Sequence, residues 1–349
     1  MPFMSARALG ALTFLISLFC LAAGAARADL VWHPDTGWQV EGGALAGVSG
    51  REGRNALELM NRAREAEERG SNGSALRAYR KVAKRYPSSV YASEALYRAA
   101  KLYLERKQYF KAFENFLAVS TQYPNTKYFD EIIGEQYRIA ALLADGARNR
   151  YWGIIPGFKN RTRAIGYFEI IVQTAPYSDY APLALMNSAR GHMRERNHEY
   201  AIDALDRMIN NYQTSLLAPN AYLRLAQTHA RLVEGPNYDQ GSTEEAITYF
   251  EDFLILFPND ENVPAAAEGL DSMKVVLSES KIVLGDFYFH KRNNYAAARV
   301  FYNEAITAYP DSEVAEKARR KLAEVDARAN NLPPPADSQP ARKKRFFFF

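Results

Sequence analysis

The chain has 349 residues, 24% of which are charged, and a formal net charge of +4. This composition is typical of a folded globular protein, and so small a net charge does not indicate a nucleic-acid partner. The single cysteine, Cys20, excludes an intrachain disulfide and a cluster of metal-binding thiolates.

Residues 1–28 have the pattern of an export signal peptide. Arg7 provides the positive start, the apolar run ALGALTFLISLFCLAAGAA follows, and an A-x-A cleavage motif occupies positions 26–28. We therefore expect the mature protein to begin at Asp29, outside the cytoplasm.

Cys20 raises a second possibility, because bacterial lipoproteins are cleaved directly before a lipidated cysteine. Their signals usually have Leu three positions before that cysteine and Gly or Ala directly before it. This chain has Ser17 and Phe19 at those positions. Lipidation of Cys20 is possible but disfavoured, and we expect no acyl chain.

Residues 29–53 form a glycine-rich leader that contains Trp32 and Trp38. The leader is expected either to dock as an extended arm or to stay loose. A repeated pattern begins after it, at residue 54.

The repeat is marked by a corner that breaks a helix, in most cases an aromatic residue followed by proline. The corners lie at Pro87, Pro124, Pro176, Gln213, Pro258 and Pro310. The intervals between them are 37, 52, 37, 45 and 52 residues, so a unit of 37 residues recurs with insertions. A fixed period of this size predicts stacked helical hairpins.

Each unit also carries a small residue followed one helical turn later by a large one, which lets two helices approach closely. The small residues are Ala75, Ala112, Ala164, Ala201, Ala246 and Ala298. The large residues are Tyr79, Phe116, Phe168, Leu205, Phe250 and Tyr302. This is the tetratricopeptide pattern, lengthened by about three residues in each unit.

The predicted fold is therefore all-α: a tetratricopeptide-type superhelix of about six helical hairpins over residues 54–329. The hairpins are expected at 54–86, 88–123, 126–175, 178–212, 216–257 and 264–309, with a capping helix at 312–329. Ser, Asn or Asp after each corner is expected to cap the next helix. Insertions at 145–161 and 233–242 split two hairpins, and 264–292 is expected to form one long helix.

The tail, residues 330–349, is expected to be disordered and ends in ARKKRFFFF. Its four cations and four phenylalanines could bind a membrane surface. A loose tail without a membrane role is the alternative, and a third possibility is that the tail enters the protein's own groove.

Few residues suggest catalysis. The sequence has neither a phosphate-binding loop nor a nucleophile elbow, so we expect no enzyme activity and no cofactor. The five histidines do not recur at metal-ligand spacing, so no metal site is expected, and His192 and His229 occupy packing positions of the repeat.

The first helices of the hairpins are expected to line a groove that binds an extended peptide. Its cations would be Arg64, Lys101, Arg138 and Arg190, beside an apolar stripe that includes Met60, Tyr97 and Met186. Cations in such a groove could bind a carboxylate or backbone carbonyls. The alternative is that they pair with nearby acids such as Glu67 and Glu105.

The export signal, the YPxSxYAxxAL corners and the split third hairpin resemble the BamD-like proteins. This family is the tetratricopeptide subunit of the machine that assembles outer-membrane β-barrels. The resemblance covers roughly 54–325 and is most specific at 243–321, from STEEAITYFEDFLILFPNDENVPAAAEGL to GDFYFHKRNNYAAARVFYNEAITAYPDSEVAEKA.

The resemblance implies a non-catalytic periplasmic scaffold at the inner face of the outer membrane. It implies two kinds of partner: the barrel-inserting subunit, assigned to 243–321, and the C-terminal segments of unfolded barrel clients. Two features depart from the family, which is usually lipidated and has five hairpins; the hairpin at 178–212 is additional. A periplasmic adaptor of the Tol–Pal envelope system is the alternative function.

Overall fold

The structure, a computed structural model, describes residues 29–41 and 51–333. The predictions for the export signal, for Cys20 and for the tail beyond residue 333 lie outside these residues. Among the described helices, none is long and apolar enough to cross a membrane.

The chain divides into two compact units, Met1–Tyr167 and Phe168–Phe349. The first unit contains β1 (Asp29–His33), β2 (Gly37–Glu41), α2 (Arg51–Glu68), α3 (Asn72–Arg85), α4 (Tyr91–Glu105), α5 (Tyr109–Gln122), α6 (Phe129–Ala144), β3 (Arg148–Tyr151), β4 (Ile155–Lys159) and the start of α7 (Arg161–Thr174). The second unit contains the rest of α7 and α8 (Tyr180–Arg194), α9 (His198–Asn211), α10 (Ala218–Ala230), α11 (Gly241–Leu256), α12 (Val263–His290), α13 (Tyr295–Ala308) and α14 (Glu313–Ala329).

The described residues thus form six pairs of consecutive helices followed by α14, with two short β-hairpins. This confirms the predicted all-α, tetratricopeptide-type fold. The long helix expected at 264–292 is α12, which has 28 residues. The array begins earlier than expected, because α2 starts at Arg51 and not at 54.

The small and large repeat positions form the core of the helix pairs. All six recurring alanines are fully buried, and none of the six large side chains is more than 2% exposed. Packing is closest where glycine replaces a side chain on α12. A Cβ atom added at Gly285 would lie 2.5 Å from the ring of Tyr302, and one at Gly269 would lie 2.5 Å from Phe250.

The corners are closed by backbone turns more than by side-chain caps. At five corners a backbone amide donates a hydrogen bond to the carbonyl three residues earlier. These amides belong to Ser89, Thr126, Ser178, Ser215 and Asp260. The residues that precede α4, α6, α8, α10 and α12 make no side-chain cap, so the capping prediction is wrong there. It is right at α14, where the Ser312 side chain accepts a bond from the Ala315 amide.

The described part of the leader docks on the first unit as a β-hairpin. Strands β1 and β2 pair antiparallel and place Trp32 opposite Trp38. The Trp38 side chain is only 2% exposed, and its backbone amide donates to Asn61 Oδ1 of α2 at 3.0 Å. Of the two expected outcomes docking is observed, although as a paired hairpin and not as a single extended arm.

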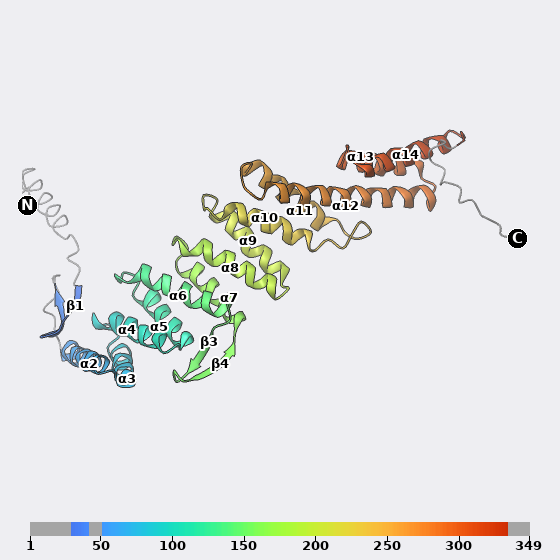
Figure 1. Cartoon of the computed structure of the whole chain (residues 1–349). Helices are drawn as coiled ribbons and strands as arrows, with labels where there is room; N and C mark the ends of the chain where they lie inside the picture. The colour runs from blue at the N-terminus through green and yellow to red at the C-terminus, as the bar shows by residue number, and fades with distance from the viewer. Residues whose placement is uncertain (1–28, 42–50, 334–349) are drawn as a thin grey trace, which may run out of the picture. The chain divides into compact units, whose positions relative to one another are not determined.

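The insertion at 145–161 contains the second hairpin, β3–β4, between α6 and α7 (Figure 1). Its strands pair antiparallel, with Arg148 opposite Lys159. The insertion at 233–242 joins α10 to α11 as a loop that runs into the first turn of α11.

Candidate functional site

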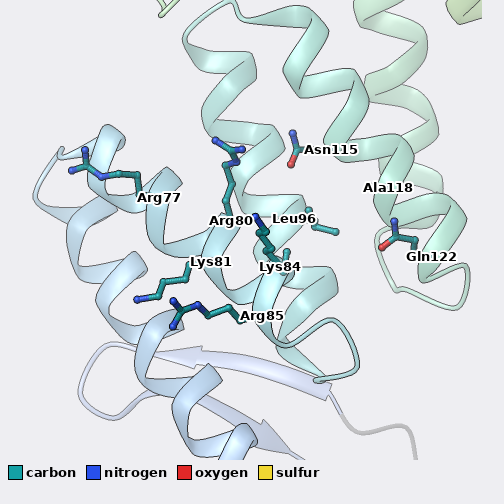
Figure 2. Close-up of a pocket in the computed structure, with 10 residues that line it drawn as sticks. Arg77, Arg80, Lys81, Lys84, Arg85, Leu96, Asn115, Ala118 and Gln122 are labelled. Carbon is teal, nitrogen blue, oxygen red and sulfur yellow. The ribbon is translucent and has the colours of Figure 1, made fainter.

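A basic pocket of about 760 Å³ opens between α3, α4 and α5 of the first unit (Figure 2). Its lining residues are Arg77, Arg80, Lys81, Ala83, Lys84, Arg85, Leu96, Asn115, Ala118 and Gln122. The five cations all lie on α3, and all five are exposed. Within the described part of the chain, none of the five forms an ion pair. The pocket therefore presents uncompensated positive charge together with two amide side chains.

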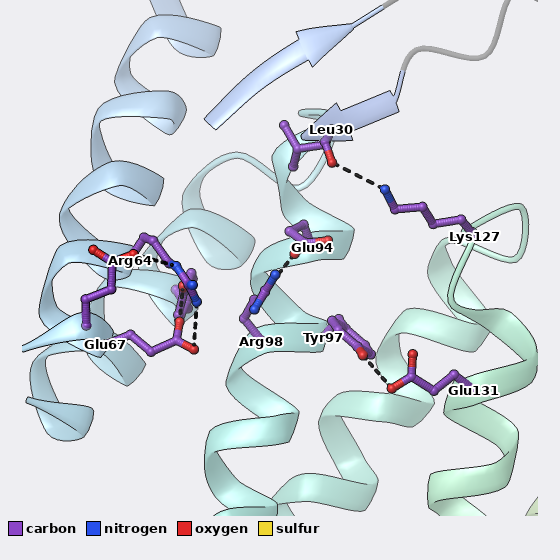
Figure 3. A network of polar contacts seen from close by, with 10 residues as sticks. Leu30, Arg64, Glu67, Glu94, Tyr97, Arg98, Lys127 and Glu131 are labelled. Carbon is purple, nitrogen blue, oxygen red and sulfur yellow. Dashed lines mark hydrogen bonds and ion pairs between the residues drawn. The ribbon is translucent and has the colours of Figure 1, made fainter. Parts of the chain in front are cut away.

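The second candidate surface is the face of the first helices, where the sequence predicts a groove. At its start, the Arg64 guanidinium pairs with Glu67 at 3.1 Å and with Glu68 at 3.1 Å (Figure 3). The same guanidinium lies over the Trp32 ring of the leader, 5.4 Å from its centroid. Arg64 is therefore already held by two carboxylates and one aromatic ring.

One hairpin further on, α6 places two acids beside Lys101. The Lys101 ammonium contacts Glu131 at 3.1 Å and Glu135 at 3.0 Å. Partial burial alone would lower the pKa of Lys101, but the hydrogen bonds to these two carboxylates outweigh it and raise that pKa. Arg138 Nε donates to Glu135 at 2.7 Å. Both cations are thus charge-balanced.

Tyr97 lies in the same network. Its ring stacks on Tyr128, with centroids 4.1 Å apart, and its hydroxyl donates to Glu131 at 2.6 Å (Figure 3). Burial and this hydrogen bond raise the pKa of Tyr97. Burial would raise the pKa of Glu131, but the bonds from Tyr97 and Lys101 lower it. Glu131 is therefore a charged acceptor within the network.

The structure brings together only part of the predicted groove. Tyr97, Lys101 and Arg138 gather around the acids of α6, whereas Met60 is fully buried and cannot line a surface. Met186 and Arg190 lie on α8, in the second unit. The alternative reading, that the cations pair with nearby acids, describes Arg64, Lys101 and Arg138.

The leader also contacts this face. The guanidinium of Arg98 lies 5.3 Å from the Trp38 ring centroid and pairs at 2.8 Å with Glu94, which is buried. Lys127 Nζ donates to the Leu30 carbonyl at 3.3 Å (Figure 3). These contacts were not predicted from the sequence, in which the two tryptophans of the leader are the signal for them.

The basic pocket was missed as well, although the sequence contains a signal for it. Residues 77–85 read RAYRKVAKR, with five cations in nine positions. The histidines at repeat positions have packing partners: His192 stacks on Tyr200 and His229 on Tyr249. Within the described residues, no group of three or more His, Cys, Asp or Glu side chains could hold a metal ion.

Comparison with known proteins gives the family. The family model described as "Outer membrane lipoprotein" (YfiO) matches residues 158–332, half of the chain. The chain belongs to this family. A model of the tetratricopeptide repeat also matches residues 94–126. The BamD-like resemblance and the repeat type are therefore confirmed.

Two relatives are outer membrane protein assembly factors named BamD. The chain is 26% identical to that of Rickettsia prowazekii over 166 residues, which is 48% of this chain and 66% of the relative. It is 25% identical to that of Caulobacter vibrioides over 138 residues, 40% and 45% of the two chains. Each alignment thus spans less than two thirds of the relative.

Among solved structures, a tetratricopeptide repeat protein from Parabacteroides merdae aligns with 77% of this chain and 99% of its own. Its sequence identity is 13% and the TM-score is 0.29.

Proposed function

We propose that this family member is a non-catalytic scaffold in the assembly of outer-membrane β-barrel proteins, placed at the periplasmic face of the outer membrane. The observation that carries the proposal is the family match over 158–332 within a tetratricopeptide-type array. Such arrays offer long exposed helical faces for binding other chains. The names of the two BamD relatives support the assignment to assembly.

We assign the barrel-inserting subunit to the C-terminal hairpins, 243–321. This region lies inside the family match, and its long helix α12 exposes apolar side chains. Val283, Leu284 and Phe287 are each between 38% and 43% exposed. Exposed aromatic and aliphatic groups on one helix are typical of protein interfaces.

We assign the C-terminal segment of an unfolded barrel client to the first unit. A free carboxylate gains the most binding free energy from cations that are not already paired, because it then displaces no other acid. The cations of the basic pocket meet this condition, whereas Arg64, Lys101 and Arg138 already hold carboxylates. The pocket is therefore the proposed carboxylate site, and the first-helix face is the competing proposal.

Peptide binding distinguishes the two surfaces. A labelled peptide ending in a free aromatic residue is titrated against the wild type and against Arg80→Ala/Lys84→Ala, Lys101→Ala/Arg138→Ala and Lys317→Ala/Arg320→Ala. The last pair is an exposed control on α14. A hydrogen bond to a charged group contributes about 1.5–3 kcal/mol, so the pocket variant should bind roughly tenfold or more weakly.

Amidation of the peptide should weaken wild-type binding to a similar extent and should change little in the pocket variant. Loss of binding only in the Lys101→Ala/Arg138→Ala variant would move the client to the first-helix face. Equal affinities for all proteins would remove both surfaces from client binding.

The scaffold assignment is tested by affinity purification from detergent-solubilised envelopes, with partners identified by mass spectrometry. A large outer-membrane barrel protein with periplasmic domains should co-purify. If the protein captured only cell-wall or inner-membrane partners, the assignment to barrel assembly would be wrong.

A further inference from the structure

The β3–β4 hairpin, which lies between α6 and α7 (Figure 1), carries several exposed large apolar side chains within eight residues. Trp152, Ile154 and Phe158 are 70%, 76% and 93% exposed, and Tyr151 and Ile155 are about half exposed. Single exposed apolar residues are normal, but a contiguous group usually marks an interaction site. The role proposed above does not account for this group.

The hairpin is held firmly in place. Arg106 donates to the Trp152 carbonyl at 2.7 Å, and the Phe110 amide donates to Asn149 Oδ1 at 3.2 Å. The Arg150 amide donates to the Lys107 carbonyl at 2.9 Å. These bonds tie the strand and its turn to the turn between α4 and α5. The apolar side chains are therefore presented on a fixed backbone.

The turn itself places tryptophan in an unfavourable conformation. Trp152 has φ of 53° and Gly153 has φ of 82°, both in the left-handed region. Glycine and asparagine suit a positive φ in the turn of a hairpin, whereas a bulky aromatic residue does not. Backbone strain of this kind concentrates at functional sites. The strain points to a use for an exposed tryptophan at the tip.

The base of the hairpin carries positive charge. Arg148 lies directly opposite Lys159 in the strand register, and Arg150 lies on the same strand as Arg148. Like charges at opposed positions destabilise a strand pair. All three side chains are exposed, and none forms an ion pair within the described residues. Anions bound at the base would relieve this repulsion.

We propose that β3–β4 is a membrane-binding element that enters the interfacial layer of a bilayer containing anionic lipids. Trp152, Ile154 and Phe158 lie at the boundary between headgroups and acyl chains, and the cations at the base contact lipid phosphates. Tryptophan and aliphatic groups next to Arg and Lys are the side chains that this layer favours.

The order of residues along the hairpin favours a membrane over a protein partner. Trp152 and Ile154 lie in the turn at the tip, with Tyr151 and Ile155 paired next to it, whereas Arg148 and Lys159 pair at the base beside Phe158, as expected for an element that enters the bilayer tip first. The matching family is described as outer membrane lipoproteins, so a bilayer is a partner consistent with that description. The proposal goes beyond the scaffold function and does not depend on it.

The test uses the exported, processed full-length protein and vesicles of phosphatidylcholine with or without phosphatidylglycerol. The hairpin variant is Trp152→Asn/Ile154→Thr/Phe158→Thr, because Asn suits the turn and Thr, which is β-branched like Ile, suits the positions in and next to β4. The matched control is Tyr177→Ser/Leu216→Ser, which removes side chains that are 100% and 98% exposed elsewhere. Circular dichroism checks that each variant folds.

Wild type and control should sediment with the anionic vesicles, and the hairpin variant should bind at least tenfold more weakly. Replacing Arg148 and Lys159 with Gln should weaken binding to the anionic vesicles by about tenfold or more. The tail and any acyl chain are the same in all the proteins, so the difference in vesicle affinity between wild type and hairpin variant reports the hairpin alone. Equal vesicle affinities of these two proteins would overturn the proposal.

Lipids brominated near the headgroup end of the acyl chain test insertion directly. They should quench tryptophan emission more in the wild type than in Trp152→Asn, since Trp32 and Trp38 contribute equally to both proteins. Equal quenching would overturn the proposal. Loss of an envelope protein from purifications with the hairpin variant, with vesicle binding unchanged, would assign the hairpin to a protein partner instead.

Discussion

Among single residues, the large core position of the repeat requires a hydrogen-bond partner where it is tyrosine and none where it is phenylalanine. The hydroxyl of Tyr79 donates to Glu67 at 2.6 Å, and that of Tyr302 donates to Asp286 at 2.6 Å. Burial raises the pKa of both tyrosines, and the adjacent carboxylates raise it further. A buried hydroxyl requires such a partner. Each tyrosine therefore depends on an acid from the first helix of its pair.

The close contact between α12 and α13 gives a stability prediction. Gly285→Ala would place a Cβ atom 2.5 Å from the Tyr302 ring, which is fully buried and bonded to Asp286. Overpacking of this kind costs roughly 1–3 kcal/mol, so urea should unfold the variant at a lower concentration. The matched control is Gly166→Ala in α7, where nothing lies within 4 Å.

The control should be neutral or more stable by about 0.5–1 kcal/mol, because alanine favours a helix more than glycine does. Equal urea concentrations at the midpoint of unfolding for Gly285→Ala and wild type would mean that α12 can move away from Tyr302 without loss of stability.

His229 gives a pH prediction. Burial lowers its pKa below the ordinary value, although Glu245 and Asp206 oppose the shift. Below about pH 6.5, His229 is therefore protonated to a greater extent in the unfolded chain than in the folded chain. The stabilising contribution of the neutral imidazole is complete above that pH and is lost as pH falls through the lower folded-state pKa.

Wild type should therefore lose more stability than His229→Gln between about pH 7.5 and 5.5, as measured by urea unfolding. The carboxylates titrate in both proteins, so the difference reports the histidine. Parallel pH profiles would contradict the assignment.

Among the secondary-structure elements, the helices were predictable from the sequence and the two β-hairpins were not. Six proline-type corners and six Ala-to-large pairs fix the helix order, since their spacing follows from the helical repeat. The leader and the 145–161 insertion have no alternating pattern, so their strands depend on tertiary contacts such as Trp38 to Asn61 and Arg106 to Trp152.

The candidate sites were predictable only in part, for a related reason. The positions of Lys101 and Arg138 on a first-helix face follow from the repeat register. The acids that neutralise Lys101 lie 30 and 34 residues away on α6, and sequence spacing alone does not bring them to it. The basic pocket depends on how α3 and α5 are arranged about α4, which the register does not specify.

The docked leader gives a prediction for β1–β2. Trp38→Ala removes the buried ring and its contact with Arg98. Loss of a buried aromatic side chain costs about 3–5 kcal/mol, and a two-stranded hairpin has little stability of its own to offset that loss. Limited proteolysis within 29–41 should therefore become at least tenfold faster. The control is Gln39→Ala, which alters an exposed position of the same strand. Unchanged cleavage in Trp38→Ala would show that the backbone pairing holds the leader without the ring.

The exposed side chains of α12 give a prediction for the partner interface. Val283→Ser/Phe287→Ser should reduce recovery of the barrel-inserting subunit from envelopes, because hot-spot side chains contribute about 2 kcal/mol or more each. Peptide binding by the first unit should not change. The control is Val300→Ser on α13, which is 54% exposed. Equal recovery with wild type and the double variant would exclude this face of α12 as the main contact.

At the scale of the whole molecule, the two units carry different features. The first contains the leader, the basic pocket and the β3–β4 hairpin, and the second contains most of the family match. Client and membrane contacts are accordingly assigned to the first unit, and the partner subunit to the second. Under these proposals, a client, a membrane surface and an assembly partner each have their own place on the chain.

We propose that the chain acts in the assembly of outer-membrane barrels, and the amount of folded barrel protein in cells reports this function. The chain is depleted in cells, and folded barrels are quantified in the outer membrane by their heat-dependent mobility on gels. Folded barrels should fall as the chain is depleted while unfolded forms accumulate, and restoring the wild-type chain should reverse both changes. Unchanged amounts of folded barrels after full depletion would contradict the assignment.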